Sequence, residues 1–129
     1  LGPTMRFTGF LRGEDVDRAY QASDVYVMPS VSEPFGLTAL EAARHGVPVV
    51  LSKTSGVAEV LRDGALAVDY WDVDRMATQI ASILRHPSLE SILRTRAAQE
   101  LRSLTWDDAA RRCLDIYERV VEDTSQEAA

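Results

Sequence analysis

Residues 25–51 have the sequence VYVMPSVSEPFGLTALEAARHGVPVVL, in which two short apolar runs flank a segment of helical character. The runs Val25–Met28 and Pro48–Leu51 have no polar face, which is typical of buried strands in a parallel sheet. Residues 37–45 are predicted to form a helix, and Gly46 stands at the position that commonly ends one. A strand, a helix and a second strand at this spacing predict a βαβ unit.

The flanking sequence extends this pattern in both directions. Residues 5–11 alternate in polarity and are predicted to form a strand, and residues 14–22 a helix. Residues 57–61 are predicted to form a short helix and residues 65–68 a further strand. We therefore predict an α/β fold, with a truncated, doubly wound (Rossmann-like) parallel sheet flanked by helices over about residues 1–70.

The last third of the chain, residues 72–122, has a helical pattern only. Asp72 is expected to cap one helix, Pro87 to begin a second, and Thr105 with Asp108 to form a capping box for a third. The apolar residues expected to pack against the rest of the domain are Met76, Ile80, Ile83 and Leu84, then Leu89, Ile92, Leu93, Ala97 and Leu101, and finally Trp106, Ala110, Cys113, Tyr117 and Val120. The polar tail, residues 123–129, is expected to fray, so that residues 1–129 form a single, partial domain.

Composition excludes several classes of protein. The chain has 129 residues, 14 basic against 20 acidic side chains and a net charge of −6, which argues against nucleic-acid binding. No apolar run reaches the roughly 20 residues that span a bilayer, and the first residues do not resemble a signal peptide. The single cysteine, Cys113, excludes an internal disulfide and is typical of a reducing compartment, so we expect a cytoplasmic protein.

The chemistry is expected in residues 29–42, which follow a buried strand and begin a helix. Ligands of open α/β sheets bind at the carboxyl ends of strands, and a helix N-terminus attracts a phosphate. Glu33 and Glu41 flank this position, and ionised carboxylates accept hydrogen bonds from sugar hydroxyl groups. These residues are compatible with a sugar nucleotide, but two acidic residues that merely interact with the helix dipole would have the same spacing.

The segment from Glu33 to Glu41, with Pro34, Phe35, Gly36 and Leu37 inside it, resembles the E-x7-E segment of the group-1 family of retaining glycosyltransferases, which have the GT-B fold. The resemblance covers about residues 5–121 and includes the strand that enters the motif, the helix and strand that leave it, and the turn at Ser55 and Gly56. It implies that the chain is the carboxyl-terminal, donor-binding part of such an enzyme.

The resemblance also implies roles for individual residues. Glu33, the candidate catalytic residue, would contact hydroxyl groups of the donor sugar, and Glu41 the hydroxyl groups of the ribose. The backbone amides of Phe35, Gly36 and Leu37 would lie beside the sugar and diphosphate, with Thr38 close behind. The donor-binding residues are thus expected to be Glu33, Pro34, Phe35, Gly36, Leu37, Thr38 and Glu41. No cofactor and no essential metal are expected, because main-chain dipoles and basic side chains would stabilise the leaving diphosphate.

Parts of the family pattern differ here. Family members usually have two glycines where this chain has Ser55 and Gly56, which leaves the geometry of that turn open. The family also has upstream units that carry a glycine turn and a basic pair, and an amino-terminal domain that binds a sugar, lipid or other acceptor. None of these precedes Leu1, and Lys53 does not match the basic pair. The chain does not begin with Met, so we expect part of a longer protein, inactive alone. The full enzyme is compatible with peripheral association with a membrane, and this part with self-association at an open sheet edge.

Two other functions remain open from the sequence: a GT-B sugar-nucleotide epimerase, and a non-catalytic nucleotide-binding or scaffold domain. The pairs Asp15–Asp17 and Asp72–Asp74 have the spacing of a metal-binding D-x-D motif, but each lies at a predicted helix start and is expected to cap it. His45 is expected to interact with the dipole at the end of its helix and His86 to lie at the surface. Trp71 and Trp106 are expected to be packing residues.

Overall fold

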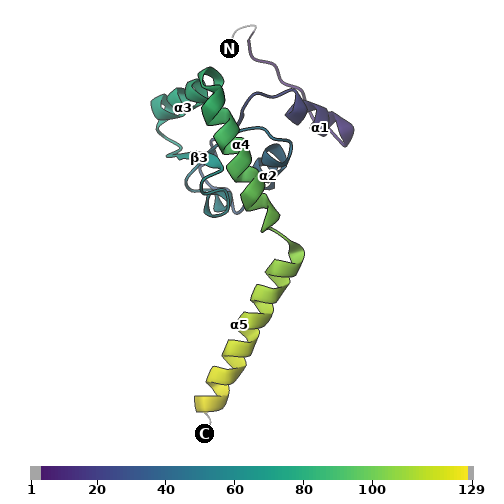
Figure 1. The fold of residues 1–129 in the computed structure, drawn as a ribbon, viewed down its shortest axis with the longest axis vertical. Helices are drawn as coiled ribbons and strands as arrows, with labels where there is room; N and C mark the ends of the chain where they lie inside the picture. Colours follow the sequence, from purple (N-terminus) through teal and green to yellow (C-terminus); the bar gives the residue numbers. More distant parts are fainter. Residues whose placement is uncertain (1–3, 128–129) are drawn as a thin grey trace.

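The computed structural model describes residues 4–127, with side chains described for residues 4–121, and it confirms the α/β fold. Figure 1 shows a small sheet covered by helices and one long helix that extends away from it. The elements in chain order are α1 (Glu14–Gln21), β1 (Tyr26–Met28), α2 (Leu37–Arg44), β2 (Val49–Ser52), the 3-10 helix η1 (Gly56–Glu59), β3 (Ala65–Val68), α3 (Val73–Arg85), α4 (Pro87–Arg102) and α5 (Trp106–Glu127).

The sheet has three parallel strands in the order β1-β2-β3, as the apolar runs predict. Val50 of the central strand lies opposite Val27 of β1 and Leu66 of β3. All four residues of β2 are buried, because helices cover both of its faces. This double coverage explains why β2 has no polar face in its sequence.

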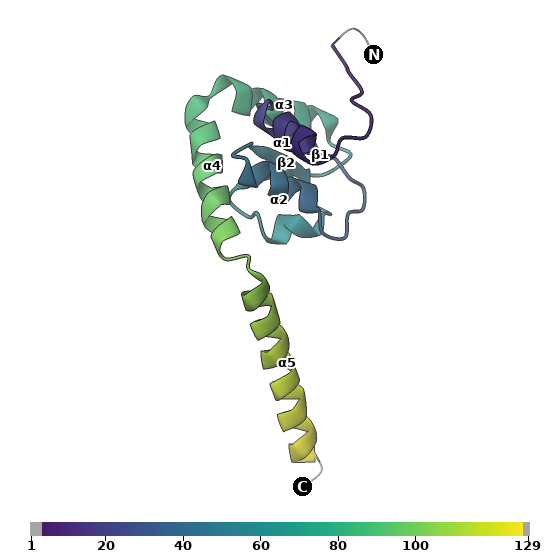
Figure 2. The same ribbon diagram turned by 90° about the vertical axis from the view of Figure 1, so that its right-hand side faces the viewer.

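The two faces of the sheet contribute to two apolar clusters. Val49 and Leu51 pack with the small residues Ala39 and Ala42 of α2, whereas Val50 packs with residues of α3 and α4. Because successive strand residues point to opposite faces, α2 and α3 cover opposite sides of the sheet (Figure 2). This is the doubly wound arrangement that the sequence predicts.

Helix α4 packs closely against the turn that leads into β3. A Cβ atom on Gly64 would lie 2.4 Å from the Cα atom of Ala97, so only a glycine fits there without a backbone shift. The two carboxylate oxygens of Glu100 accept the backbone N–H groups of Asp63 and Gly64 at 2.9 and 3.0 Å. The apolar stripes predicted for α3 and α4 are confirmed at Met76, Ile83, Leu93 and Ala97, which are buried, but Leu84 and Ile92 are exposed.

The strand predicted for residues 5–11 is not present. These residues pair with none of the described strands, and the rings of Phe7 and Phe10 are 81% and 85% exposed. In Figure 1 the segment runs away from the sheet. The pattern of alternating polarity is a local property, whereas a strand exists only where another strand offers hydrogen bonds.

Helix α5 does not pack on the domain, and this corrects the prediction for its apolar residues. Figures 1 and 2 show it projecting from the end of α4. Cys113 is exposed rather than a core residue, Trp106 is 92% exposed, and Trp71 outside this helix is exposed as well. The stripe shows that the helix is amphipathic, but periodicity does not identify what covers that face.

The ends of the last three helices correspond to their sequence signals in most respects. Asp72 caps α3 by accepting the backbone N–H of Arg75, and Pro87 is the first residue of α4. Thr105 accepts the backbone N–H of Asp108, while the Asp108 carboxylate binds the Thr105 hydroxyl rather than a backbone amide. Helix α5 continues to Glu127 through the stretch expected to fray, and residues 128 and 129 lie outside the described residues.

No helix among the described residues is both long enough and apolar enough to cross a bilayer.

Candidate functional site

The loops that follow β1 and β2 meet at the carboxyl edge of the sheet, where the sequence predicts the site. A parallel bridge joins Glu33 of the first loop to Ser55 of the second. The backbone N–H of Gly56 donates to the carbonyl oxygen of Glu33 at 3.1 Å, and that of Val57 to the carbonyl of Phe35 at 2.6 Å. The backbone around Glu33 and Phe35 is therefore held by the neighbouring turn rather than by its own residues alone.

Two glycines make this close approach possible. Gly36 has a φ of +100°, and a Cβ atom there would lie 2.8 Å from Met28 Cε and 3.0 Å from Val57 Cγ1. A Cβ atom on Gly56 would lie 2.2 Å from the carbonyl oxygen of Pro34. Gly36 is thus required for its backbone conformation, whereas Gly56 is required for space, because the atom it would meet belongs to the backbone.

Ser55, where family members usually have a first glycine, adopts an ordinary extended conformation with a φ of −84°. Its side chain is buried, and its hydroxyl donates to the carbonyl oxygen of Ser52 at 2.5 Å. A residue other than glycine is therefore compatible with this turn, and the Ser55 hydroxyl is already hydrogen-bonded within the protein.

Glu33 lies partly buried in the loop before α2, and its Oε1 atom accepts the backbone N–H of Phe35 at 3.4 Å. Pro34, Phe35 and Leu37 are exposed around it. The first two backbone amides of α2, those of Leu37 and Thr38, find no acceptor within the described part of the chain. This end of the helix therefore presents unpaired N–H donors at the surface beside a carboxylate.

Thr38 belongs to a short chain of hydroxyl groups. Tyr26 of β1 donates its hydroxyl to Thr38 Oγ1 at 2.7 Å, and Thr38 donates to the sulfur atom of Met28 at 3.9 Å. A thioether is a weak acceptor, so the Thr38 proton is available to a better one at small cost.

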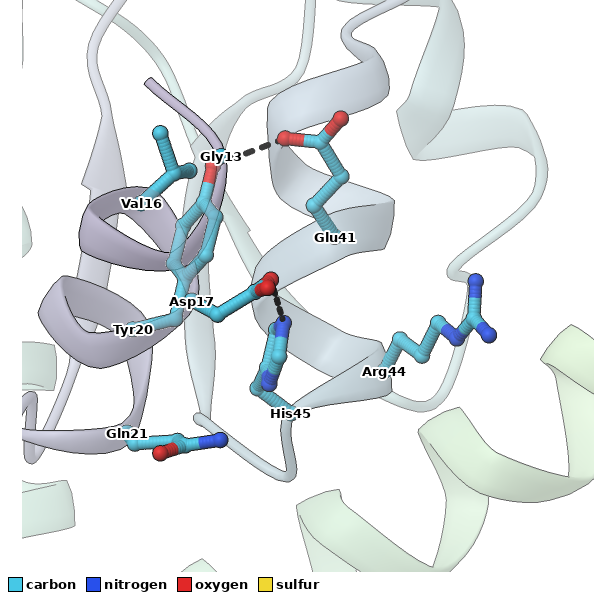
Figure 3. Close-up of a pocket in the computed structure, with 8 residues that line it drawn as sticks. All are labelled: Gly13, Val16, Asp17, Tyr20, Gln21, Glu41, Arg44 and His45. Atoms are coloured by element: carbon cyan, nitrogen blue, oxygen red, sulfur yellow. Dashed lines mark hydrogen bonds and ion pairs between the residues drawn. The ribbon is translucent and has the colours of Figure 1, made fainter. Parts of the chain in front are cut away.

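Glu41 is exposed on α2, one helical turn after Leu37, and contacts α1. The hydroxyl of Tyr20 donates to Glu41 Oε2 at 3.1 Å (Figure 3). Burial, together with the hydrogen bond to Glu41 and the negative charge of Glu41, raises the pKa of Tyr20 to about 12. The Tyr20 hydroxyl therefore remains a donor to Glu41 at every physiological pH.

His45 lies beneath the same contact, at the end of α2. Its Nε2 atom lies 3.0 Å from Asp17 Oδ1, and its ring stacks on Tyr20 with the centroids 5.5 Å apart and an angle of 17° between the planes. Its main partners are thus side chains of α1, in addition to the helix dipole that the sequence suggests. Asp15 and Asp17 do not cap α1, because the N-cap residue is Gly13 and both aspartates lie within the helix, where Asp15 pairs with Arg18 and Asp17 with His45.

A cavity of about 640 Å³ lies between α1 and α2, and Figure 3 shows the side chains around it. It is lined by Gly13, Val16, Asp17, Tyr20, Gln21, Glu41, Arg44 and His45. Of the predicted site residues only Glu41 lines it; Glu33 to Thr38 lie at the other end of α2, at the loop. Leu37 and Glu41 also line a second cavity of about 400 Å³ beside the end of α4.

Sequence reasoning missed Tyr20 and Tyr26 as parts of the site. Their spacing on a predicted helix and strand indicates core positions, and both rings do pack, with centroids 6.0 Å apart. Only the tertiary structure brings each hydroxyl to a polar residue of α2.

Among the described residues, no three histidine, cysteine or carboxylate side chains are grouped closely enough to hold a metal ion.

Comparison with known proteins identifies the relatives of this chain. The family described as glycosyl transferases group 1 matches residues 1–100. The chain is 33% identical over 113 residues to the O-antigen chain mannosyltransferase B of Escherichia coli, covering 88% of this chain and 30% of that protein. It is 33% identical over 120 residues to a D-inositol 3-phosphate glycosyltransferase of a Nocardioides species, covering 92% of this chain and 26% of the relative.

Among solved structures, the chain is similar to a sucrose-phosphate synthase from Thermosynechococcus elongatus, with a TM-score of 0.73 and 29% sequence identity. That match covers 92% of this chain and 30% of the other. The chain therefore spans about a third or less of the length of these relatives.

Proposed function

The chain belongs to group 1 of the glycosyl transferases, a family of enzymes with the GT-B fold, and on this premise we propose that it supplies part of a donor site for a nucleoside-diphosphate sugar. The reaction would be transfer of the glycosyl unit with retention to a sugar, lipid or other acceptor. The acceptor would bind to a part of the longer protein that this chain does not span, so the chain alone is not expected to turn over.

One observation carries the proposal: the unpaired amides at the start of α2 follow the Glu33 carboxylate in the chain and precede the Glu41 carboxylate by about one helical turn, and Tyr20 binds Glu41. A diphosphate is an acceptor only and suits the unpaired amides of Leu37 and Thr38, the amide of Gly36 just before them and the hydroxyl of Thr38. Sugar and ribose hydroxyl groups are donors and suit Glu33 and Glu41. The order of groups along the site thus parallels the order along a sugar nucleotide.

Glu33 is the proposed catalytic residue, because it would contact the sugar at the reacting end of the donor. The bond that breaks leaves negative charge on the diphosphate, and the helix amides would stabilise that charge where it develops. Basic side chains from outside this chain would add to the effect. On this proposal the reaction needs no metal.

A ligand-observed NMR titration tests the proposal. The full-length protein and this chain are each mixed with uridine, guanosine and adenosine diphosphate and with their common sugar conjugates. Saturation transfer to ribose and sugar protons of one nucleotide class, lost in Glu41→Ala, is the expected result. Glu118→Ala, which removes an exposed carboxylate on α5, is the matched control and should bind like the unsubstituted protein.

Two other outcomes are informative. Saturation transfer seen only with the full-length protein, and not with this chain, would mean that essential contacts lie outside the chain. No saturation transfer with either protein, or binding that Glu41→Ala leaves unchanged, would contradict the proposed site and favour a scaffold role for the motif.

A further inference from the structure

Tyr20 and Tyr26 form an aromatic pair that connects α1 and β1 to the polar side of α2. The two rings meet edge to face at an angle of 60°. Each hydroxyl donates to a different residue of α2, that of Tyr20 to Glu41 and that of Tyr26 to Thr38. The pair therefore touches two residues to which the proposed function assigns ligand contacts.

We propose that Tyr20 is a positioning residue, which holds the Glu41 carboxylate in the orientation that accepts the two ribose hydroxyl groups of the donor. The inference rests on the proposed function and deepens it. Tyr20 would not touch the reacting atoms; it would act through Glu41.

The first argument is the freedom that Glu41 would otherwise have. An exposed glutamate on a helix surface samples several rotamers, and ordering its side chain on binding costs free energy. A hydrogen bond from Tyr20 to Oε2 selects one of these rotamers before the ligand arrives. Each carboxylate oxygen accepts more than one hydrogen bond, so the contact leaves acceptor sites for a vicinal pair of hydroxyl groups.

The second argument is that Tyr20 is itself held on more than one side. One neighbour is the ring of His45, which Asp17 in turn engages at 3.0 Å. Tyr26 meets the Tyr20 ring at its edge, and Tyr26 is fixed by its bond to Thr38. A partly buried ring with two aromatic neighbours is a stiffer support for a carboxylate than a long, flexible basic side chain would be.

The third argument is the chemistry of the donor group. A lysine or arginine at this position would neutralise Glu41, whereas a neutral hydroxyl orients the carboxylate and leaves its charge in place. The pKa of Tyr20, raised to about 12, keeps that hydroxyl protonated and neutral. Tyr20 therefore orients the carboxylate without placing a positive charge beside it.

The test is a double-mutant cycle in the full-length protein, read out as the affinity for uridine, guanosine and adenosine diphosphate. Tyr20→Phe removes one oxygen and keeps the ring. We expect it to weaken binding of the preferred diphosphate by about 3- to 10-fold, the usual effect of one hydrogen bond. In the Glu41→Ala background, the same change should have no further effect.

The 2′,3′-dideoxy form of each diphosphate distinguishes positioning from a general structural role. The dideoxy form lacks the hydroxyl groups from which Glu41 would accept hydrogen bonds, so Tyr20→Phe should leave the affinity for this form unchanged. Tyr117→Phe on the exposed helix α5 removes the same atom far from the site and serves as the control. Three results would each overturn the inference while leaving the proposed function intact. Tyr20→Phe could weaken the affinity for the ribose and dideoxy forms equally, its effect could add to that of Glu41→Ala, or it could leave the affinity unchanged.

Failure of the proposed function gives a different result. If Glu41→Ala binds every diphosphate as tightly as the unsubstituted protein, or if the full-length protein binds none, the assigned role of Glu41 is wrong and the inference is refuted with it.

Discussion

Single residues decide the backbone geometry of the candidate site. Gly36 and Gly56 come from different loops: Gly36 adopts a left-handed backbone conformation, and Gly56 allows a close approach to the backbone of Pro34 that one additional carbon atom would block. The residue that a Cβ on Gly56 would meet is Pro34, inside the predicted donor-binding segment. The shape of the loop around Glu33 therefore depends on a residue more than 20 positions away in the sequence.

Replacing Gly56 by alanine should consequently affect both stability and ligand binding. The new Cβ would lie 2.2 Å from a backbone oxygen, which cannot rotate away as a side chain can. We expect a loss of about 3 kcal/mol in the free energy of unfolding and a weaker affinity for the donor, measured by urea denaturation and by NMR titration.

Gly46→Ala is the matched control. Gly46 has a φ of +74° and open space around it, so alanine there should cost only about 1 kcal/mol through backbone strain and leave donor binding unchanged. Equal effects of the two substitutions on binding would show that the contact with Pro34 does not shape the site.

At the scale of elements, α4 is attached to the sheet by a polar contact as well as by its apolar face. Both carboxylate oxygens of Glu100 accept backbone N–H groups of Asp63 and Gly64, in the turn just before β3. Glu100 thus caps the turn at Asp63 and Gly64 from a distant helix. The close packing of Gly64 on Ala97 brings the two elements near enough for this contact.

Glu100→Ala should therefore lower the free energy of unfolding by about 2 kcal/mol, because it leaves two backbone donors without their charged acceptor. Glu90→Ala on the same helix removes a carboxylate that forms a surface ion pair with Arg94, and it should cost less than about 0.5 kcal/mol. Thermal and urea unfolding of the two variants measure the difference. A loss for Glu100→Ala no larger than that for Glu90→Ala would contradict the capping role.

At the scale of the whole molecule, two kinds of surface lie open. The outer edges of β1 and β3 pair with no strand among the described residues, and the projecting helix α5 has exposed apolar side chains such as Trp106 and Leu114. Proteins usually protect the edges of their sheets, because an open edge is a template for pairing with another chain. Both features are typical of a domain whose open surfaces are covered by other polypeptide, either another part of the same protein or a second copy of this chain.

We therefore expect this chain, prepared alone, to self-associate in a concentration-dependent manner. Light scattering or sedimentation equilibrium is the suitable measurement, since the projecting α5 would distort a mass estimated from elution volume. Truncation after Ser103 identifies the surface responsible: association that persists without α5 points to the sheet edge, and association that disappears points to the helix. A monomer at all concentrations would refute the expectation.

How much of this architecture was predictable depends on the range of the interactions involved. Helix α2, strand β2 and strand β3 were predicted closely, because periodicity, Gly46 and buried apolar runs are local signals. The 3-10 helix at Gly56–Glu59 was predicted as a short helix with slightly different bounds. The strand predicted for residues 5–11 was wrong, because alternation within a segment does not supply the neighbouring strand that it needs.

The same distinction applies to the candidate site. The sequence by itself predicted that the segment from Glu33 to Glu41 follows a strand and enters a helix, since chain neighbours define both, and the structure confirms this; the role of the segment in donor binding stays a prediction. Only the tertiary structure decided that Ser55 is compatible with its turn, that Tyr20 binds Glu41 and that α5 stands apart. The physical reason is that hydrogen bonds and apolar contacts between distant segments depend on how the elements pack, and a one-dimensional pattern specifies which face of an element is apolar but not what that face meets.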